Sequence, residues 1–154
     1  MCPAQLLRTI AASVTIRRME GTGLLSSRTI QKKVKALARL LDQPTLTINT
    51  QSMEDGSPHI EVADAYYLVV RERGNEVSRK RTTDPDEILY WIMEGHTSAL
   101  SWDFELRHRR DGEDSRRQAF ARQVELLATL SPQWAERQRL EQAKILERHP
   151  FHDN

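Results

Sequence analysis

The stretch that decides the fold is residues 83–130, TDPDEILYWIMEGHTSALSWDFELRHRRDGEDSRRQAFARQVELLATL. It holds two of the three tryptophans and two of the three phenylalanines, so many of the large side chains that can anchor a core lie here. Asp84 is followed by Pro85, and Glu87 stands three residues after Asp84. This is the pattern of a capped helix start with proline at the first helical position. We therefore predict a helix that starts at Asp84 and stops at Gly95.

Residues 96–110 carry two competing patterns. Apolar and polar residues alternate over residues 100–106, as they do in a half-buried strand. A second helix capped by Thr97 accommodates the same residues, and we favour the helix. The pair Asp111-Gly112 predicts a turn at the end of the segment under both interpretations.

Residues 114–130 predict an amphipathic helix, because apolar residues recur at spacings of three and four. Arg116 and Arg117 border its apolar face. One interpretation pairs them with Asp103 or Glu105 of the preceding segment; the other leaves them as a solvated charged edge.

A last helix is expected from Ser131-Pro132 to about His149, since serine followed by proline is a second capped start. Pro150 ends it. Phe151 stands close to the end of the sequence, where an aromatic residue is more often a packing residue than a ligand-binding one.

The chain before residue 83 predicts a helix over residues 27–41, again from apolar spacings of three and four. Alternation and turn residues predict a three- or four-stranded antiparallel meander from residues 45–50, 59–62, 65–71 and 76–82, with a turn at 55–58. The fold class is therefore α+β, with an N-terminal helix, a small antiparallel β-meander and a C-terminal three-helix region. We expect residues 27–154 to form a single domain.

Residues 1–26 are basic, rich in Ser and Thr, and contain no acid before Glu20. This composition resembles a mitochondrial targeting segment. The simpler interpretation, which we favour, is a poorly ordered N-terminal extension.

The formal net charge is +1, which predicts no strong overall field toward nucleic acid or membranes. The charges are unevenly distributed, because residues 83–130 contain ten Asp and Glu against six Lys and Arg. The first part of this stretch predicts an acidic surface, formed by Asp84, Asp86, Glu87, Glu94, Asp103 and Glu105. The helix at 27–41 has basic outer faces that could meet phosphate, although a solvated face is the commoner case; they carry Lys32, Lys33, Lys35 and Arg39.

No catalytic constellation is visible in the sequence. The single cysteine, Cys2, excludes an intrachain disulfide and a cysteine-based metal site. The five histidines lack the spacing of a helical zinc site, and the glycines are scattered singly rather than gathered in a phosphate-binding loop. No apolar run is long enough to cross a membrane. We expect a soluble protein with no cofactor, no metal and no enzymatic activity.

From about Ile30 to Asp153 the chain resembles the Imm63 family of immunity proteins, which accompany bacterial polymorphic toxins. The segments that carry the resemblance, in order, are HIEV at 59–62, YYLVVRERGNEVSRKRTTDPDEILYWI at 66–92, FELRHR at 104–109, DSRRQAF at 114–120, QVELL at 123–127, Trp134 and HPFHD at 149–153.

The resemblance implies a cytoplasmic protein that binds a cognate toxin domain and neutralises it without chemistry of its own. The acidic surface would then meet a basic toxin, such as a nuclease. The alternative hypothesis is a nucleic-acid-binding regulator that uses the basic helix 27–41. A third is a small enzyme with a carboxylate or histidine site, which predicts a deep pocket where several titratable groups converge. Six resembling residues are interpreted first as structural: Glu72, Arg73, Arg79, Arg116, Arg117 and Phe151.

Overall fold

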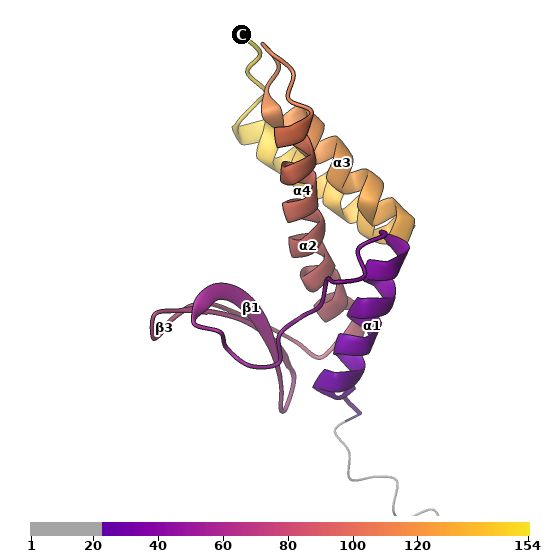
Figure 1. Cartoon of the computed structure of the whole chain (residues 1–154), viewed down its shortest axis with the longest axis vertical. Helices are drawn as coiled ribbons and strands as arrows, with labels where there is room; N and C mark the ends of the chain where they lie inside the picture. The colour runs from indigo at the N-terminus through magenta and orange to yellow at the C-terminus, as the bar shows by residue number, and fades with distance from the viewer. Residues whose placement is uncertain (1–22) are drawn as a thin grey trace, which may run out of the picture.

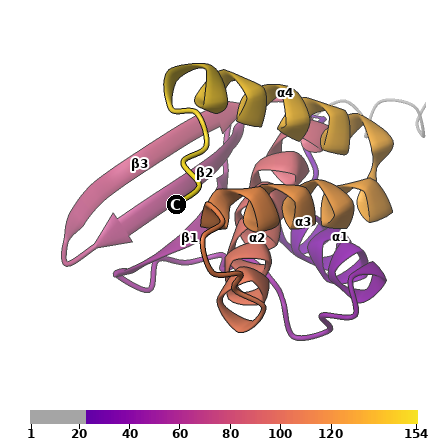
Figure 2. The same ribbon diagram turned by 90° about the horizontal axis from the view of Figure 1, so that it is seen from above.

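The computed structural model describes residues 23–154. The elements in chain order are α1 (Ser27–Leu40), β1 (Asp55–Val62), β2 (Tyr66–Glu72), β3 (Asn75–Thr82), α2 (Pro85–Arg107), α3 (Ser115–Leu130) and α4 (Pro132–Arg148). The predicted α+β class is confirmed, with an N-terminal helix, a meander of three strands and three C-terminal helices. Figure 1 shows the sheet on one side of the central helix α2, and Figure 2 shows α1 and α4 at opposite margins of the helical part.

The predicted stop at Gly95 is wrong, because α2 runs without interruption for 23 residues. Glycine inside a helix costs only about 1 kcal/mol, and tertiary packing on both sides of it offsets that cost. Thr97 does not cap a second helix. Its hydroxyl donates to the carbonyl of Met93, 2.8 Å away in the preceding turn. The alternation over residues 100–106 therefore lies on a helix, as the favoured interpretation expected.

No strand forms at residues 45–50 within the described chain. This segment makes only an isolated bridge, between Asn49 and His59. Two of its carbonyls bind helix side chains instead: the Thr47 oxygen accepts from His96 Nε2 and the Ile48 oxygen from Gln31 Nε2, both at 2.9 Å. These bonds take up acceptors that a fourth strand would have used.

The predicted turn at residues 55–58 is also wrong, because these residues form the first half of β1. The register shifts between Asp55 and Pro58, so a bulge lies where we expected the turn. Gly56 has φ +85° in this bulge, a backbone conformation that glycine adopts without strain. Pro58 is tolerated because β1 is an edge strand of the sheet.

The core lies where α1, the sheet and the first half of α2 meet. Ile30 and Val34 of α1, Tyr66 of β2 and Ile88 and Met93 of α2 have at most 1% of their surface exposed. Leu24 and Leu25 pack against the same cluster. The predicted extension 1–26 falls outside the described residues except at 23–26, and there the chain is part of the packed structure.

A cluster of buried glutamines joins α2, α3 and α4. Gln123, Gln138 and Gln142 are each 5–6% exposed. The Oε1 atom of Gln123 accepts from the Nε2 atoms of Gln138 and Gln142 at 3.3 and 3.4 Å, and its own Nε2 donates to the carbonyl of Glu94. Tyr90 completes the cluster by donating its hydroxyl to Gln138 at 3.0 Å. Each amide therefore has a partner away from water.

The last residues fold back onto the start of α3 and form what we call the C-terminal clasp. Arg116 donates to the carbonyls of His149 and Pro150, both at 2.8 Å, and Arg117 forms an ion pair with Asp153 at 2.8 Å. The Arg117 guanidinium lies 4.2 Å from the ring centroid of Phe151. In addition, Asp114 accepts from the backbone N–H of His152 at 2.9 Å.

The clasp changes the expected pairing of the two arginines. They bind Asp114 and Asp153 rather than Asp103 or Glu105. The structural interpretation of Arg116, Arg117 and Phe151 agrees with these contacts.

Candidate functional site

The first three predicted site residues, Asp84, Asp86 and Glu87, lie in and before the first turn of α2. Asp84 is the N-cap and accepts from the N–H of Asp86 at 2.8 Å. Asp86 accepts from the indole N–H of Trp134 at 3.1 Å. Glu87 receives two hydrogen bonds from Arg137, at 2.5 and 2.9 Å. Each carboxylate thus has a partner, and for Asp86 and Glu87 that partner is on α4.

The other three predicted residues lie further along α2. Glu105 is 1% exposed and receives two hydrogen bonds from Arg109, both at 3.0 Å. Asp103 is exposed and forms an ion pair with Arg107. Glu94 is half-buried beside the sheet.

These six carboxylates do not form one surface. From residue 84 to residue 105 a helix rises about 30 Å, so the two ends of the set are far apart. The structure brings Asp84, Asp86 and Glu87 together at one end of α2, whereas Glu105 turns into the protein. Asp84, Asp86 and Asp103 remain exposed to solvent.

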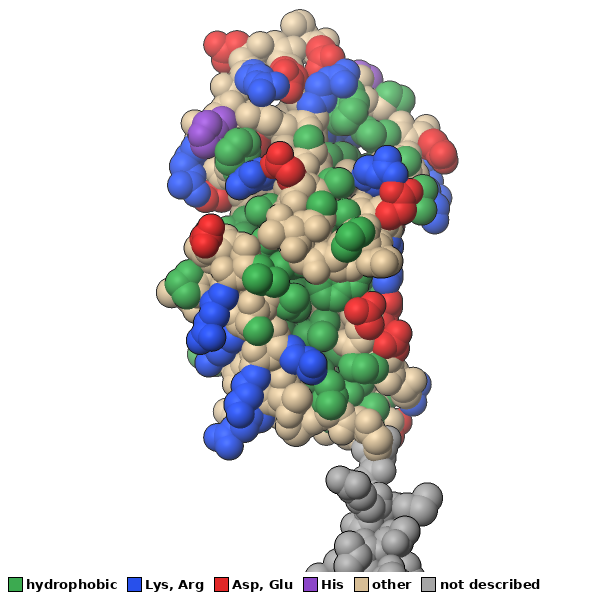
Figure 3. All heavy atoms as spheres, turned by 90° about the vertical axis from the view of Figure 1, so that its right-hand side faces the viewer, with side chains coloured by type: hydrophobic (Ala, Val, Ile, Leu, Met, Phe, Trp, Pro, Cys, Tyr) green, Lys and Arg blue, Asp and Glu red, His purple; other side chains and the backbone are tan. Residues whose placement is uncertain are grey.

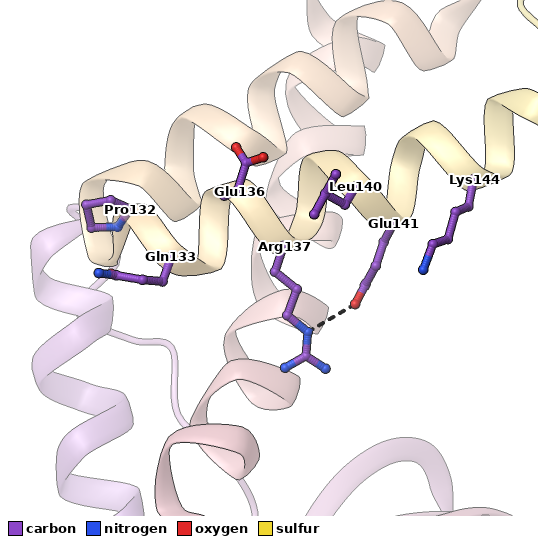
Figure 4. A pocket seen from close by; sticks show the side chains of 7 residues that line it. All are labelled: Pro132, Gln133, Glu136, Arg137, Leu140, Glu141 and Lys144. Carbon is purple, nitrogen blue, oxygen red and sulfur yellow. Dashed lines mark hydrogen bonds and ion pairs between the residues drawn. The ribbon is translucent and has the colours of Figure 1, made fainter.

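Arg137 is the centre of a charged seam between α2 and α4. Its guanidinium lies 3.9 Å from the ring centroid of Tyr90 and also binds Glu141 at 3.1 Å. The hydrogen bonds from Arg137 hold the pKa of Glu87 below its ordinary value. Figure 4 shows Arg137 and Glu141 in an open hollow on α4, whose lining also includes Leu140 and Lys144. Because Glu87 and Glu141 are both bound to Arg137, these contacts hold α4 against α2, and neither carboxylate is free to act as a general acid or base.

A second hollow, of about 420 Å³, lies between the helix-facing side of the sheet and the middle of α2. Its walls include Leu68 and Val70 of β2 and Trp91 of α2. Lys80 of β3 lies over the Trp91 ring, 5.5 Å from its centroid. Burial raises the pKa of Glu94, which lines the same hollow, although the nearby Lys80 opposes this shift.

Glu94→Gln is expected to raise the melting temperature at pH 7. A glutamate whose folded pKa is raised contributes stability at low pH and loses it as the pH rises through the folded pKa. The neutral amide removes the cost of burying the charge, so the variant should gain stability at pH 7 and gain little at pH 4. Thermal melts at both pH values check this. An equal or lower melting temperature at pH 7 would contradict the burial argument, and the exposed Glu147→Gln serves as control.

The basic residues of the alternative hypothesis, Lys32, Lys33, Lys35 and Arg39, are all exposed on α1. They lie on a different element from the six carboxylates.

Within residues 23–154, no three His, Cys, Asp or Glu side chains converge as a metal site requires. In the same residues, no helix combines the length and the apolar character needed to span a bilayer.

The structure is a small α+β protein in which charged side chains pair between its own elements, as Arg137 pairs with Glu87 and Arg117 with Asp153. Residues 63–144 match the family described as Immunity protein 63, and the chain belongs to this family, Imm63. The match covers β2, β3, α2, α3 and most of α4, a shorter range than the expected resemblance from about 30 to 153. No curated protein and no solved structure matches the chain.

Proposed function

We propose that this protein binds a cognate toxin domain in a stoichiometric complex and neutralises it without catalysis. The observation that carries this proposal is the match of residues 63–144 to the Immunity protein 63 family. Under the proposal it acts in the cytoplasm of a bacterium that carries a polymorphic toxin system.

The engagement of the polar groups supports a contact function. Arg137, Glu87 and Glu141 are used between helices, and Arg116 and Arg117 are used in the C-terminal clasp. A stoichiometric inhibitor needs complementary surface and no reacting groups. Its specificity then comes from exposed side chains.

The acidic surface remains a proposal, now divided between the two ends of α2: Asp84, the N-cap, marks its start and Asp103 lies near its end, and both are exposed. A basic toxin would be attracted to either end. Asp84→Asn keeps the capping oxygen while removing the charge, so it leaves the helix start intact.

The proposed function is tested by co-expressing the full chain with the C-terminal toxin domain encoded by the neighbouring upstream gene. We expect survival, and co-purification as a one-to-one complex. The toxin domain expressed alone should kill, and an unrelated immunity protein serves as the negative control. No rescue and no complex, with the chain folded and the toxin active, would overturn the proposal.

The acidic proposal is tested in the same complex. Asp84→Asn combined with Asp103→Lys is expected to weaken binding about tenfold or more. Asp111→Lys, an exposed acid in the turn between α2 and α3, is the control and should leave affinity within about threefold. Unchanged affinity in the double variant would remove the acidic surface and leave the toxin-binding function in place.

A further inference from the structure

Helix α1 carries five Lys and Arg side chains and no Asp or Glu. Arg28, Lys32, Lys35 and Arg39 follow one another at spacings of four, three and four, so they form a single stripe along the helix. All four are exposed, and the stripe lies opposite the face that buries Ile30. It extends over about 16 Å.

Nothing in the described fold neutralises this stripe. The sequence of α1, SRTIQKKVKALARL, contains no acid, and none of the four cations has a carboxylate within 4.0 Å among residues 23–154. Three arginines of the sheet differ, because each has a carboxylate partner: Arg71, Arg79 and Arg81 pair with Glu54, Glu61 and Asp64 at 2.9, 2.9 and 3.3 Å.

The stripe is unfavourable for the isolated helix. Like charges four residues apart repel, as Arg28 and Lys32 do, and so do Lys35 and Arg39. Arg28 also stands in the first turn, where the helix dipole favours a negative charge. Carboxylates on a bound partner would remove this repulsion.

A largely apolar hollow of about 370 Å³ lies beside the stripe. Its α1 side is formed by Ala36 and Leu37 with Lys33, and its other side by Leu89, Leu130 and Trp134 with Asp86 and Ser131. Ala36 lies one turn from both Lys32 and Arg39, so the hollow flanks the second half of the stripe. In the lower half of Figure 3, Lys and Arg side chains lie along the left margin, apolar side chains fill the middle, and Asp and Glu side chains lie at the right margin.

We infer that the stripe and the hollow together form a docking surface for an acidic face of the toxin domain, with carboxylates along the stripe and one apolar side chain in the hollow. This inference rests on the proposed function and adds a second contact to it. The toxin domain would present acidic groups to the α1 stripe, whereas the separate proposal for Asp84 and Asp103 needs basic groups opposite α2. A protein fits better than a nucleic acid, because the hollow is walled by leucines, which a phosphate backbone does not match. The surface lies largely on α1, outside the family match at 63–144. It is therefore a candidate for the part of the protein that selects its own toxin over the toxins of other family members.

The test uses three variants of the full chain and a toxin domain made inactive in its own active site. Lys32→Glu with Lys35→Glu reverses the centre of the stripe. Ala36→Arg fills the mouth of the hollow while keeping the surface positive. Lys144→Glu with Arg148→Glu makes the same charge change on α4, at two exposed cations without an ion pair in the described chain.

Lys32→Glu with Lys35→Glu should weaken the complex at least about tenfold in calorimetric titration, and Ala36→Arg should weaken it about fivefold or more. The α4 control should stay within about threefold. The stripe variant should also melt no lower than the unchanged chain, because its new glutamates can pair with Arg28 and Arg39. A loss of binding without a loss of stability separates contact from folding.

Unchanged affinity in both α1 variants would overturn the inference while leaving the proposed function intact. A chain without substitutions that forms no complex would overturn both, and this is seen before any variant is measured. A third outcome would also overturn the inference. The chain would bind a short RNA or duplex DNA with steep salt dependence, and Lys32→Glu with Lys35→Glu would abolish this binding but not toxin binding. The stripe would then be a nucleic-acid interface.

Discussion

A chain that ends at Arg148 will melt at least about 5 °C below the full chain, because it lacks the C-terminal clasp. Phe151 packs near Phe120, with ring centroids 6.4 Å apart, and its removal exposes apolar surface worth about 2 kcal/mol. The two carbonyls that Arg116 binds are lost with it, and Arg117 loses Asp153. Thermal unfolding of the two chains measures the effect.

The clasp also predicts how this difference depends on pH. The arginines hold the pKa values of Asp114 and Asp153 below their ordinary value of 3.8. A carboxylate with a lowered folded pKa stabilises above its unfolded pKa, and this stability is lost as the pH falls through the folded pKa. The gap between the two chains should therefore be largest above about pH 5 and shrink below 3.8.

Phe151→Ala and Asp153→Ala should each reproduce part of the loss, and the exposed Lys144→Ala should reproduce none of it. A truncated chain that melts within about 2 °C of the full chain at pH 7 would show that the clasp contributes little to stability.

Gln123→Ala will lower the free energy of unfolding by about 2–4 kcal/mol. The residue is 5% exposed, and its side-chain oxygen accepts from both Gln138 and Gln142. Truncation leaves buried amide N–H groups without this acceptor and opens a cavity between α2 and α3. Urea unfolding measures the loss, and the exposed Gln133→Ala is the control, expected within about 0.5 kcal/mol.

The same cluster allows a sharper test. Replacing Gln123, Gln138 and Gln142 together by methionine removes donors and acceptors at once, and the Tyr90 hydroxyl keeps Glu141 as an acceptor at 3.2 Å. This variant should lose less stability than Gln123→Ala, because fewer buried polar groups remain unpaired. A larger loss in the triple variant would mean that the amides stabilise the helices more than their desolvation costs.

Sequence reasoning failed at Gly95 and at residues 45–50 for related reasons. A glycine is a local stop signal, but the packing of α2 against the sheet and α3 outweighs it. The alternation at 45–50 is a local strand signal, but His96 and Gln31 bind the carbonyls of Thr47 and Ile48. Both failures come from contacts between residues distant in sequence.

The candidate site shows the same division. The sequence places six acids within one acidic stretch, yet Glu105 is buried against the protein and Glu87 is bound by Arg137. The basic spacing of α1 was visible in the sequence. Only the folded chain shows that no described carboxylate pairs with these basic residues and that a hollow lies beside them.

The α+β class, the capped helix starts at Asp84 and Ser131, the strands of the meander after residue 58 and the resemblance to the Imm63 family could be read from the sequence. These depend on local spacing and on residue types, which the chain carries with it. Only the tertiary structure decided which charges are paired, where the C-terminal residues bind and which face of α1 remains without a partner. The energy of a charge depends on the groups that folding brings within a few ångströms of it, and the order of the residues does not state those distances.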